Sequence, residues 1–180
     1  MGLKMLLNAK ILVIEDDSDY LETIIRRLKK KGYLTIESVS TLSSAINELD
    51  NAYDVIVADM RLGDAASGGF TVVDEIKKRN ITSIVIILTA NDSVIDCRKA
   101  LQYGGLCWDY IFKSMTEGSA LEELHNSIQK GLKSRGNGRD ILWIEENKGE
   151  LLTKYSGKYI AVINWKESKE YNNIQYRIKP

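Results

Sequence analysis

Histidine and cysteine are scarce in this sequence, which has one histidine and two cysteines among its 180 residues. The single histidine, His125, excludes a metal site built from several histidines. Cys97 and Cys107 form neither a CxxC pair nor a zinc-binding spacing with histidine. We therefore interpret both cysteines as reduced thiols of a cytoplasmic protein.

The sequence also lacks an excess of either charge and a long apolar run. Its 25 lysines and arginines balance 25 aspartates and glutamates, so no overall field favours nucleic acid or anionic lipid. The first residues include a lysine and lead directly into acids, unlike a signal peptide. No stretch approaches the roughly 18–20 apolar residues of a membrane span. We predict a cytoplasmic protein with no membrane partner and no specific binding to DNA.

What the sequence does contain is an alternation of short apolar runs and segments with helical periodicity. The run at 84–88 is the strongest strand signal, because five apolar residues follow one another there. Strands are predicted at 11–14, 34–39, 55–58, 84–88 and 110–112, and helices at 18–32, 42–49, 70–78, 92–103 and around 121–132. Parallel strands need crossover connections, so five βα units in tandem predict a doubly wound α/β fold with helices on both faces of a parallel sheet.

The composition changes after the fifth βα unit. Residues 134–140 (SRGNGRD) are polar and glycine-rich, and we predict a linker there between a domain over 1–133 and a short α/β extension over 141–180. The extension is predicted to be a helix at 141–155 and a hairpin with strands at 159–165 and 174–178. We expect it to pack on the first domain or on a second copy of the chain, with Trp143 and Trp165 as anchors.

Polar residues stand at the carboxyl ends of four predicted strands, which is the edge where open α/β sheets bind ligands. Clustered carboxylates repel each other unless a cation joins them, and Mg²⁺ prefers oxygen ligands of this kind. A lysine and a hydroxyl would hold phosphoryl oxygens, so the pattern predicts Mg²⁺-assisted phosphoryl chemistry. The residues are Glu15, Asp16 and Asp17 after the first strand, Asp59 after the third, Thr89 after the fourth and Lys113 after the fifth.

Four segments, ILVIEDD, VIVADMRL, IILTA and YIFK, resemble the signature segments of the receiver domains of two-component response regulators. The resemblance spans residues 9–133, with the segments in the family's order, and implies a flavodoxin-like, CheY-like fold. It implies a phosphoprotein whose Asp59 accepts a phosphoryl group from a sensor histidine kinase or a phosphotransfer protein. It also implies a downstream protein partner whose binding is switched by phosphorylation.

The resemblance implies a particular set of Mg²⁺ ligands. Asp16 and Asp59 would bind the metal directly, together with the backbone carbonyl of Arg61. Glu15 would act mainly through bound water. The alternative for the acids near Glu15 is a cluster at a helix N-terminus that the macrodipole stabilises.

The resemblance also assigns roles in phosphoryl binding and switching. Thr89 would hydrogen-bond the phosphoryl group, and Lys113 would pair with it. Tyr110 matches the aromatic position that changes rotamer on activation, so Thr89 and Tyr110 are the expected switch residues. The structural alternatives are a helix cap for Thr89, a surface lysine for Lys113 and a core tyrosine for Tyr110.

The chain departs from the family pattern at three places. Gly63 stands where the family usually has proline, and residues 104–109 (GGLCWD) are about two residues longer than the usual connection into the fifth strand. Ser114 follows Lys113 where the family normally has a cis proline. A non-proline cis bond costs about 2.5–4 kcal/mol, so we predict a trans Lys113–Ser114 bond with Lys113 still pointing at Asp59.

Three other functions compete with a response regulator. A phosphatase that forms an aspartyl-phosphate needs a second acid two residues after the nucleophile, and Arg61 stands there, so we predict that the protein is not an enzyme. A transcription factor needs a DNA-reading element, and the extension has no helix-turn-helix pattern. A pseudo-receiver that serves only as an interaction scaffold would not need the complete set of acids, threonine and lysine.

Overall fold

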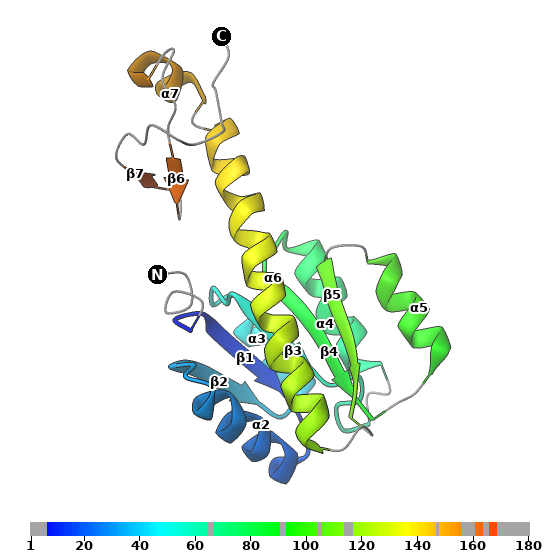
Figure 1. Cartoon of the computed structure of the whole chain (residues 1–180). Coiled ribbons are helices and arrows are strands. Elements are labelled where there is room, and N and C mark those ends of the chain that lie inside the picture. Colours follow the sequence, from blue (N-terminus) through cyan, green and yellow to red (C-terminus); the bar gives the residue numbers. More distant parts are fainter. Residues whose placement is uncertain are drawn as a thin grey trace. The chain divides into compact units, whose positions relative to one another are not determined.

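The five apolar runs form one parallel sheet with the strand order β2-β1-β3-β4-β5 (Figure 1). This confirms the predicted flavodoxin-like α/β fold. β3 and β4 are buried along their whole length, because helices cover both faces of the sheet centre. The strands are β1 (Lys10–Ile14), β2 (Thr35–Val39), β3 (Val55–Ala58), β4 (Ile84–Thr89) and β5 (Cys107–Phe112).

Two apolar cores lie on opposite faces of the sheet. Successive strand residues point to opposite faces, so Val57 belongs to one core and the adjacent Ala58 to the other. One core is covered by α2 (Ser18–Lys30) and α6 (Glu117–Glu146), which Figure 1 shows in front of the sheet. The other is covered by α3 (Leu42–Glu48), α4 (Gly68–Lys78) and α5 (Val94–Gln102).

The structure, a computed structural model, describes residues 7–64, 67–90, 93–103, 106–113, 117–146, 148–155, 161–163 and 166–168. Side chains are described within these ranges as far as residue 134, and again at 149–151, 153 and 154. The chain divides into two compact units, Met1–Leu132 and Lys133–Pro180, and each is described by itself. The domain bounds at 133 and 141 stay a prediction.

Short polar side chains cap the N-termini of three of the described helices. Asp17 caps α2 by accepting hydrogen bonds from the backbone N–H groups of Asp19 and Tyr20, both at 3.0 Å. Thr41 caps α3 and Ser93 caps α5 in the same way. These caps satisfy N–H groups that have no partner inside the helix. Asp17 is therefore a capping residue, which separates it from the neighbouring acids Glu15 and Asp16.

The fifth strand is longer than predicted, and it contains an irregularity. Val85 is level with Cys107 while the next residue of β4, Ile86, is level with Asp109, so Trp108 has no partner in the β4 register. A β-bulge absorbs one extra residue in this way. Part of the additional length at 104–109 is therefore built into β5, and the prediction of a strand confined to 110–112 was too short.

The predicted linker at 134–140 is helical, because α6 runs without interruption from Glu117 to Glu146. The two glycines of SRGNGRD each cost about 1 kcal/mol in a helix, whereas extending a helix that already exists avoids the cost of nucleating a new one. The helix predicted at 141–155 accordingly comprises the end of α6 and a separate α7 (Lys148–Tyr155). Among the described residues, no helix is both long and apolar enough to cross a membrane.

The C-terminal unit contains α7 and an antiparallel pair, β6 (Ala161–Ile163) and β7 (Lys166–Ser168). β6 lies inside the strand predicted at 159–165. β7 was not predicted, because its sequence KES has no apolar residue. The strand predicted at 174–178, the side chain of Trp143 and all of Trp165 lie outside the described residues.

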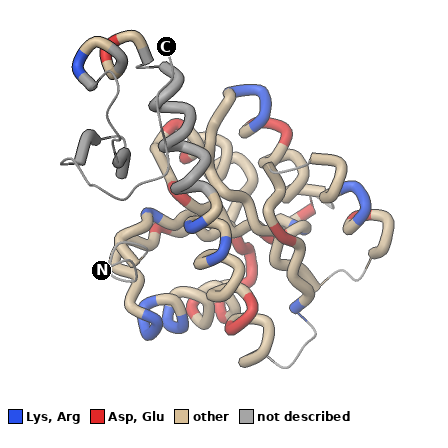
Figure 2. The backbone as a smooth tube through the Cα atoms, turned by 45° about the horizontal axis from the view of Figure 1, so that its top comes forward, with Lys and Arg blue, Asp and Glu red and all other residues tan. Residues whose placement is uncertain are grey.

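Charged residues of the first unit are distributed over many elements (Figure 2). In this view lysine and arginine (blue) alternate with aspartate and glutamate (red). The balance of charge over the whole chain, 25 against 25, is consistent with this mixture. One basic stretch is the last turn of α2, which contains Arg27, Lys29 and Lys30 and so complements the negative end of the helix.

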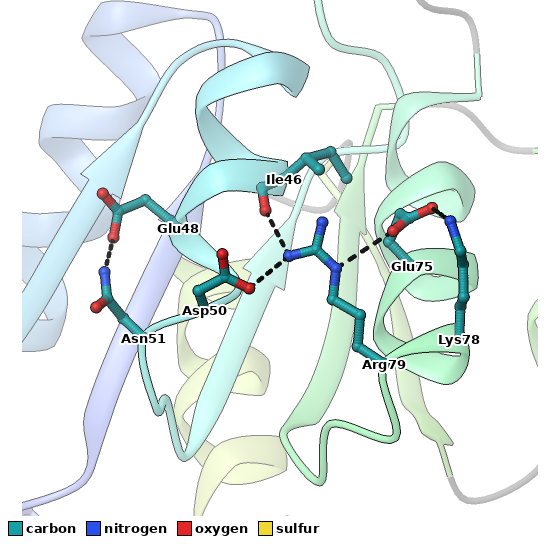
Figure 3. Close-up of polar contacts among 7 residues, drawn as sticks. All are labelled: Ile46, Glu48, Asp50, Asn51, Glu75, Lys78 and Arg79. Carbon is teal, nitrogen blue, oxygen red and sulfur yellow. Dashed lines mark hydrogen bonds and ion pairs between the residues drawn. The ribbon is translucent and has the colours of Figure 1, made fainter.

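Arg79 joins α3 to α4 on the face of the sheet that these two helices cover (Figure 3). Its guanidinium donates from Nη1 to the Ile46 carbonyl at 3.1 Å and to Asp50 Oδ1 at 2.8 Å. Its Nε donates to Glu75 Oε2 at 3.3 Å. The Ile46 carbonyl belongs to the last turn of α3, where helix carbonyls lack internal partners.

Replacing Arg79 with methionine is expected to lower the free energy of unfolding by about 1 kcal/mol, the scale of a net hydrogen bond. The apolar stem is kept, while the partners of the guanidinium are lost. Lys78→Met is the matched control, because Lys78 pairs with Glu75 at 3.1 Å from a largely exposed position. Urea denaturation should show a loss for Arg79→Met and none for Lys78→Met. Equal losses would contradict the interpretation of Arg79 as a link between the helices.

Candidate functional site

The ends of β1 and β3 bring three carboxylates together. These strands are neighbours, with Ile14 level with Ala58, so the residues that follow them lie side by side. Carboxylate oxygens of Glu15, Asp16 and Asp59 all lie within 4.8 Å of one another. The structure thus brings the three predicted acidic metal ligands into one cluster at the predicted edge of the sheet.

Lys113 reaches this cluster from the end of β5. Its ammonium donates to Glu15 Oε2 at 2.7 Å and to Asp59 Oδ2 at 2.8 Å, and its side chain is 11% exposed. Its backbone N–H donates to the Thr89 carbonyl at 2.7 Å, which continues the contact between β4 and β5 past the strand end. The prediction that Lys113 points at Asp59 is confirmed. The Lys113–Ser114 bond, predicted to be trans, lies outside the described residues.

One lysine does not balance the negative charge of the cluster. Glu15 is 2% exposed, and burial raises the pKa of its carboxyl to about 7. The hydrogen bond and charge of Lys113 oppose this rise in the pKa of Glu15, whereas the charge of Asp59 adds to it. A divalent cation among the carboxylates would favour the charged form of Glu15 and so oppose the effect of burial and the smaller effect of Asp59.

Asp59 has one carboxylate oxygen available for a ligand. Its Oδ2 accepts from Lys113, while Oδ1 is buried and has no hydrogen-bond partner among the described residues. Buried polar atoms are nearly always paired, so this oxygen is a candidate atom for binding a ligand or ion. The carboxylates of Glu15, Asp16 and Asp59 match the ligands of a hard divalent cation such as Mg²⁺, and Oδ1 of Asp59 is available as one such ligand atom.

The loop after β3 holds Asp16 from the other side. Met60 and Leu62 are buried, whereas the side chain of Arg61 between them is exposed. The Gly63 N–H donates to Asp16 Oδ2 at 2.9 Å, and Gly63 has φ +56°. Proline has neither an N–H nor access to positive φ, so glycine at this position makes a contact that the usual residue of the family would exclude.

The predicted switch residues lie on the neighbouring strands. Thr89 ends β4 and is 1% exposed. Tyr110 is level with Ile87 and packs, partly buried, against the core under α3, α4 and α5. Burial is the main reason why the pKa of Tyr110 is raised to about 12. The structure thus places Thr89 at the end of β4, the strand beside β3, and Tyr110 on β5, one strand further from β3. Their switching role stays a prediction.

Two residues that shape this site were not predicted from the sequence. The Lys113 ammonium lies 4.7 Å from the centre of the Tyr20 ring. Gly69, in the first turn of α4, lies against the backbone of Asp59 and Met60 and donates from its N–H to the Met60 carbonyl at 3.1 Å. The contact of Tyr20 has no local signal, because it joins segments that are distant in the chain. The contact of Gly69 depends on how the loop between β3 and α4 folds.

Residues 11–128 match the family model of the response regulator receiver domain, which is more than half of the chain. The chain belongs to the response regulator receiver family. This confirms the family inferred from the four sequence segments. Receiver domains of two-component systems interact with histidine kinases or phosphotransfer proteins, and the acidic cluster of this receiver domain fits the Mg²⁺ site of the family.

Two curated relatives of this receiver domain are transcriptional regulatory proteins. BasR of Escherichia coli K12 is 34% identical over 129 residues, which are 71% of this chain and 54% of BasR. CiaR of Streptococcus pneumoniae is 30% identical over 128 residues, which are 71% of this chain and 53% of CiaR. The chain thus spans about half the length of these relatives. Both relatives are transcriptional regulators by name, so the comparisons do not support our prediction that specific binding to DNA is absent.

A solved structure supports the same fold. The chain is 30% identical to the non-phosphorylated HemR receiver domain of Leptospira biflexa, with a TM-score of 0.59. The superposition covers 67% of this chain and 94% of the HemR domain. The receiver fold therefore accounts for the first unit of the chain.

Proposed function

We propose that this receiver domain is a phosphorylation-controlled switch in which Asp59 accepts a phosphoryl group from a sensor histidine kinase or a phosphotransfer protein. The observation that carries the proposal is the surroundings of Asp59. Lys113 holds one of its carboxylate oxygens at 2.8 Å, and the other is buried without a partner among the described residues. One oxygen is thus oriented, and the other is available to attack phosphorus.

In the proposed transfer, Oδ1 of Asp59 forms a bond to phosphorus while the phosphorus–nitrogen bond of a phosphohistidine breaks. The imidazole leaves with the electron pair of that bond and takes up a proton. The Lys113 ammonium passes from Asp59 Oδ2 to a phosphoryl oxygen, and the Thr89 hydroxyl donates to another. The product is a mixed anhydride whose formation changes the surroundings of Thr89 and Tyr110.

The acidic cluster supplies the ligands for Mg²⁺ in this proposal. Asp16 and Asp59 would hold the ion directly with the backbone carbonyl of Arg61, and Glu15 would act through bound water. The ion would neutralise the carboxylates and the incoming phosphoryl group. The structural support is the grouping of the three carboxylates, whose oxygens lie within 4.8 Å of one another.

We propose signalling, without catalytic turnover of a separate substrate, as the outcome of this transfer. A phosphatase of this chemistry needs an acid two residues after the nucleophile, and the exposed side chain at that position is Arg61. Phosphorylation would control contact with a downstream protein or with a second copy of the chain. The proposal does not specify whether the final target of this contact is a protein or DNA, since the curated relatives are transcriptional regulators by name.

The test is labelling of the whole chain by acetyl phosphate with and without Mg²⁺, followed by intact-mass measurement. We expect one added phosphoryl group with Mg²⁺ and none after removal of divalent cations with EDTA. Peptide mapping should place the group on Asp59. Labelling that persists without a divalent cation, or that maps elsewhere, would overturn the proposal and favour the pseudo-receiver alternative.

Gly63 gives a second prediction about the metal site. Replacing Gly63 with proline removes the N–H that binds Asp16 Oδ2 and is incompatible with φ +56°. We expect Mg²⁺ affinity, measured by calorimetry, to fall roughly 3- to 10-fold, corresponding to about 1 kcal/mol, the scale of one net hydrogen bond. Gly63→Asn is the matched control, because asparagine keeps the N–H and tolerates positive φ. Equal weakening in both variants would show that the hydrogen bond is not the cause.

A further inference from the structure

Tyr20 lies beside the acidic cluster but belongs to a different element, the first turn of α2. Its backbone N–H donates to the capping residue Asp17 at 3.0 Å, which fixes the start of the helix. Its ring packs against the core under α2 and α6, and its hydroxyl oxygen is buried. Tyr20 is therefore held in place by its backbone hydrogen bond and by the packing of its ring.

The ring of Tyr20 faces the ammonium of Lys113. Lys113 Nζ lies 4.7 Å from the ring centre, within the range of a cation–π contact. The same ammonium donates to Glu15 and Asp59, and it is largely withdrawn from water. An ammonium has three N–H bonds, so these two carboxylates use two of them, and the ring face stabilises the charge without accepting a directed hydrogen bond.

This arrangement matters for a lysine that has to change partners. In the proposed transfer Lys113 gives up Asp59 Oδ2 for a phosphoryl oxygen. The attraction of the ring depends weakly on the rotation of the ammonium, whereas each hydrogen bond depends strongly on direction. A ring that is itself anchored by the core can hold the ammonium during that exchange without competing for its protons.

We propose that Tyr20 is a positioning residue that holds the Lys113 ammonium over Glu15 and Asp59 through the face of its ring. The inference rests on the proposed phosphorylation of Asp59 and adds a residue from α2 to the machinery of that step. Tyr20 touches neither the phosphoryl group nor the metal in this proposal. Its whole effect passes through Lys113.

The kinetic test compares Tyr20→Leu with Tyr20→Phe in the full chain. Leucine keeps an apolar side chain but has no ring face, whereas phenylalanine keeps the ring and lacks the hydroxyl. With acetyl phosphate and saturating Mg²⁺, we expect the labelling rate to fall about 2- to 10-fold in Tyr20→Leu, on the scale of a desolvated cation–π contact. Tyr20→Phe should stay within about 2-fold of the wild-type rate. A Tyr20→Phe variant as slow as Tyr20→Leu would overturn the role of the ring.

A double-mutant cycle separates positioning from a general loss of structure. In a Lys113→Met background, Tyr20→Leu should have no further effect on the labelling rate, because the group on which Tyr20 acts is gone. The same fold-decrease in both backgrounds would show that Tyr20 acts on the fold and not on Lys113. That result would overturn the proposal.

A spectroscopic test does not depend on phosphorylation. The ring current of Tyr20 should shift the NMR signals of the Lys113 ε-methylene protons upfield in the unphosphorylated protein. The shift should persist in Tyr20→Phe and disappear in Tyr20→Leu, and its absence from the wild-type protein would overturn the contact. If the wild-type chain takes no label, the proposed function fails, and this NMR measurement still decides whether Tyr20 positions Lys113.

Discussion

Replacing Asp59 with asparagine is expected to abolish phosphoryl labelling completely while the protein remains folded. The amide is not nucleophilic, so no acyl phosphate forms at this position. The Lys113 ammonium keeps its 2.7 Å hydrogen bond to Glu15, so no buried charge is left without a partner. The substitution also removes a negative charge that raises the pKa of Glu15. We therefore expect a melting temperature in the absence of metal that is no lower than that of the wild type.

Two further acids provide controls for the Asp59→Asn result. Asp64 is exposed in the same loop, and Asp64→Asn should be labelled as fast as the wild type. Asp16→Asn keeps the proposed nucleophile but removes a proposed metal ligand, so it should be labelled only at higher Mg²⁺ concentrations. Label on Asp59→Asn, measured by intact mass, would show that another residue accepts the phosphoryl group.

Replacing Gly69 with alanine is expected to destabilise the first unit and to disturb Asp59. A Cβ at this position would lie 2.7 Å from the Asp59 carbonyl oxygen, 3.1 Å from Met60 Cα and 3.2 Å from Ile87 Cδ1. Two of these atoms belong to the backbone that carries Asp59 and cannot turn aside as a flexible side chain would. Overpacking of this kind costs about 1–3 kcal/mol, and we expect that loss in urea denaturation together with slower labelling.

Gly118→Ala is the matched control for Gly69→Ala. Each glycine is the second residue of its helix, Gly69 in α4 and Gly118 in α6. The atom nearest to a Cβ at Gly118 is Arg27 Nη2 at 3.3 Å, at the end of a flexible side chain. Because alanine is favoured over glycine in a helix by about 0.5–1 kcal/mol, Gly118→Ala should be neutral or stabilising. Equal stability of the two alanine variants would refute the close packing at Asp59.

Much of the fold was predictable because its signals are local. The continuous apolar runs at 55–58 and 84–88 match β3 and the core of β4, since strands buried on both faces need no polar alternation. Each run ends in a polar residue, and parallel strands place all their carboxyl ends at one edge. The cluster of Glu15, Asp16 and Asp59 followed from that rule alone.

The predictions that were wrong concern segments whose structure depends on the element next to them. SRGNGRD has the composition of a linker, but α6 continues through it because extending an existing helix costs less than starting another. The bulge at Trp108 depends on how β5 fits against β4, which composition does not encode. β7 consists of charged and polar residues and pairs only because β6 lies opposite to it.

The sequence by itself determined which chemical groups follow each strand: four acids after β1 and β3, a threonine at the end of β4 and a lysine after β5. Only the tertiary structure decided which atoms meet. It assigned Asp17 to the helix cap, joined the Gly63 N–H to Asp16, and placed the Tyr20 ring over Lys113. The physical reason is that the spacing of apolar residues and the ends of strands depend on residues that are neighbours in the sequence. A hydrogen bond or cation–π contact between distant segments exists only after the sheet has brought them together.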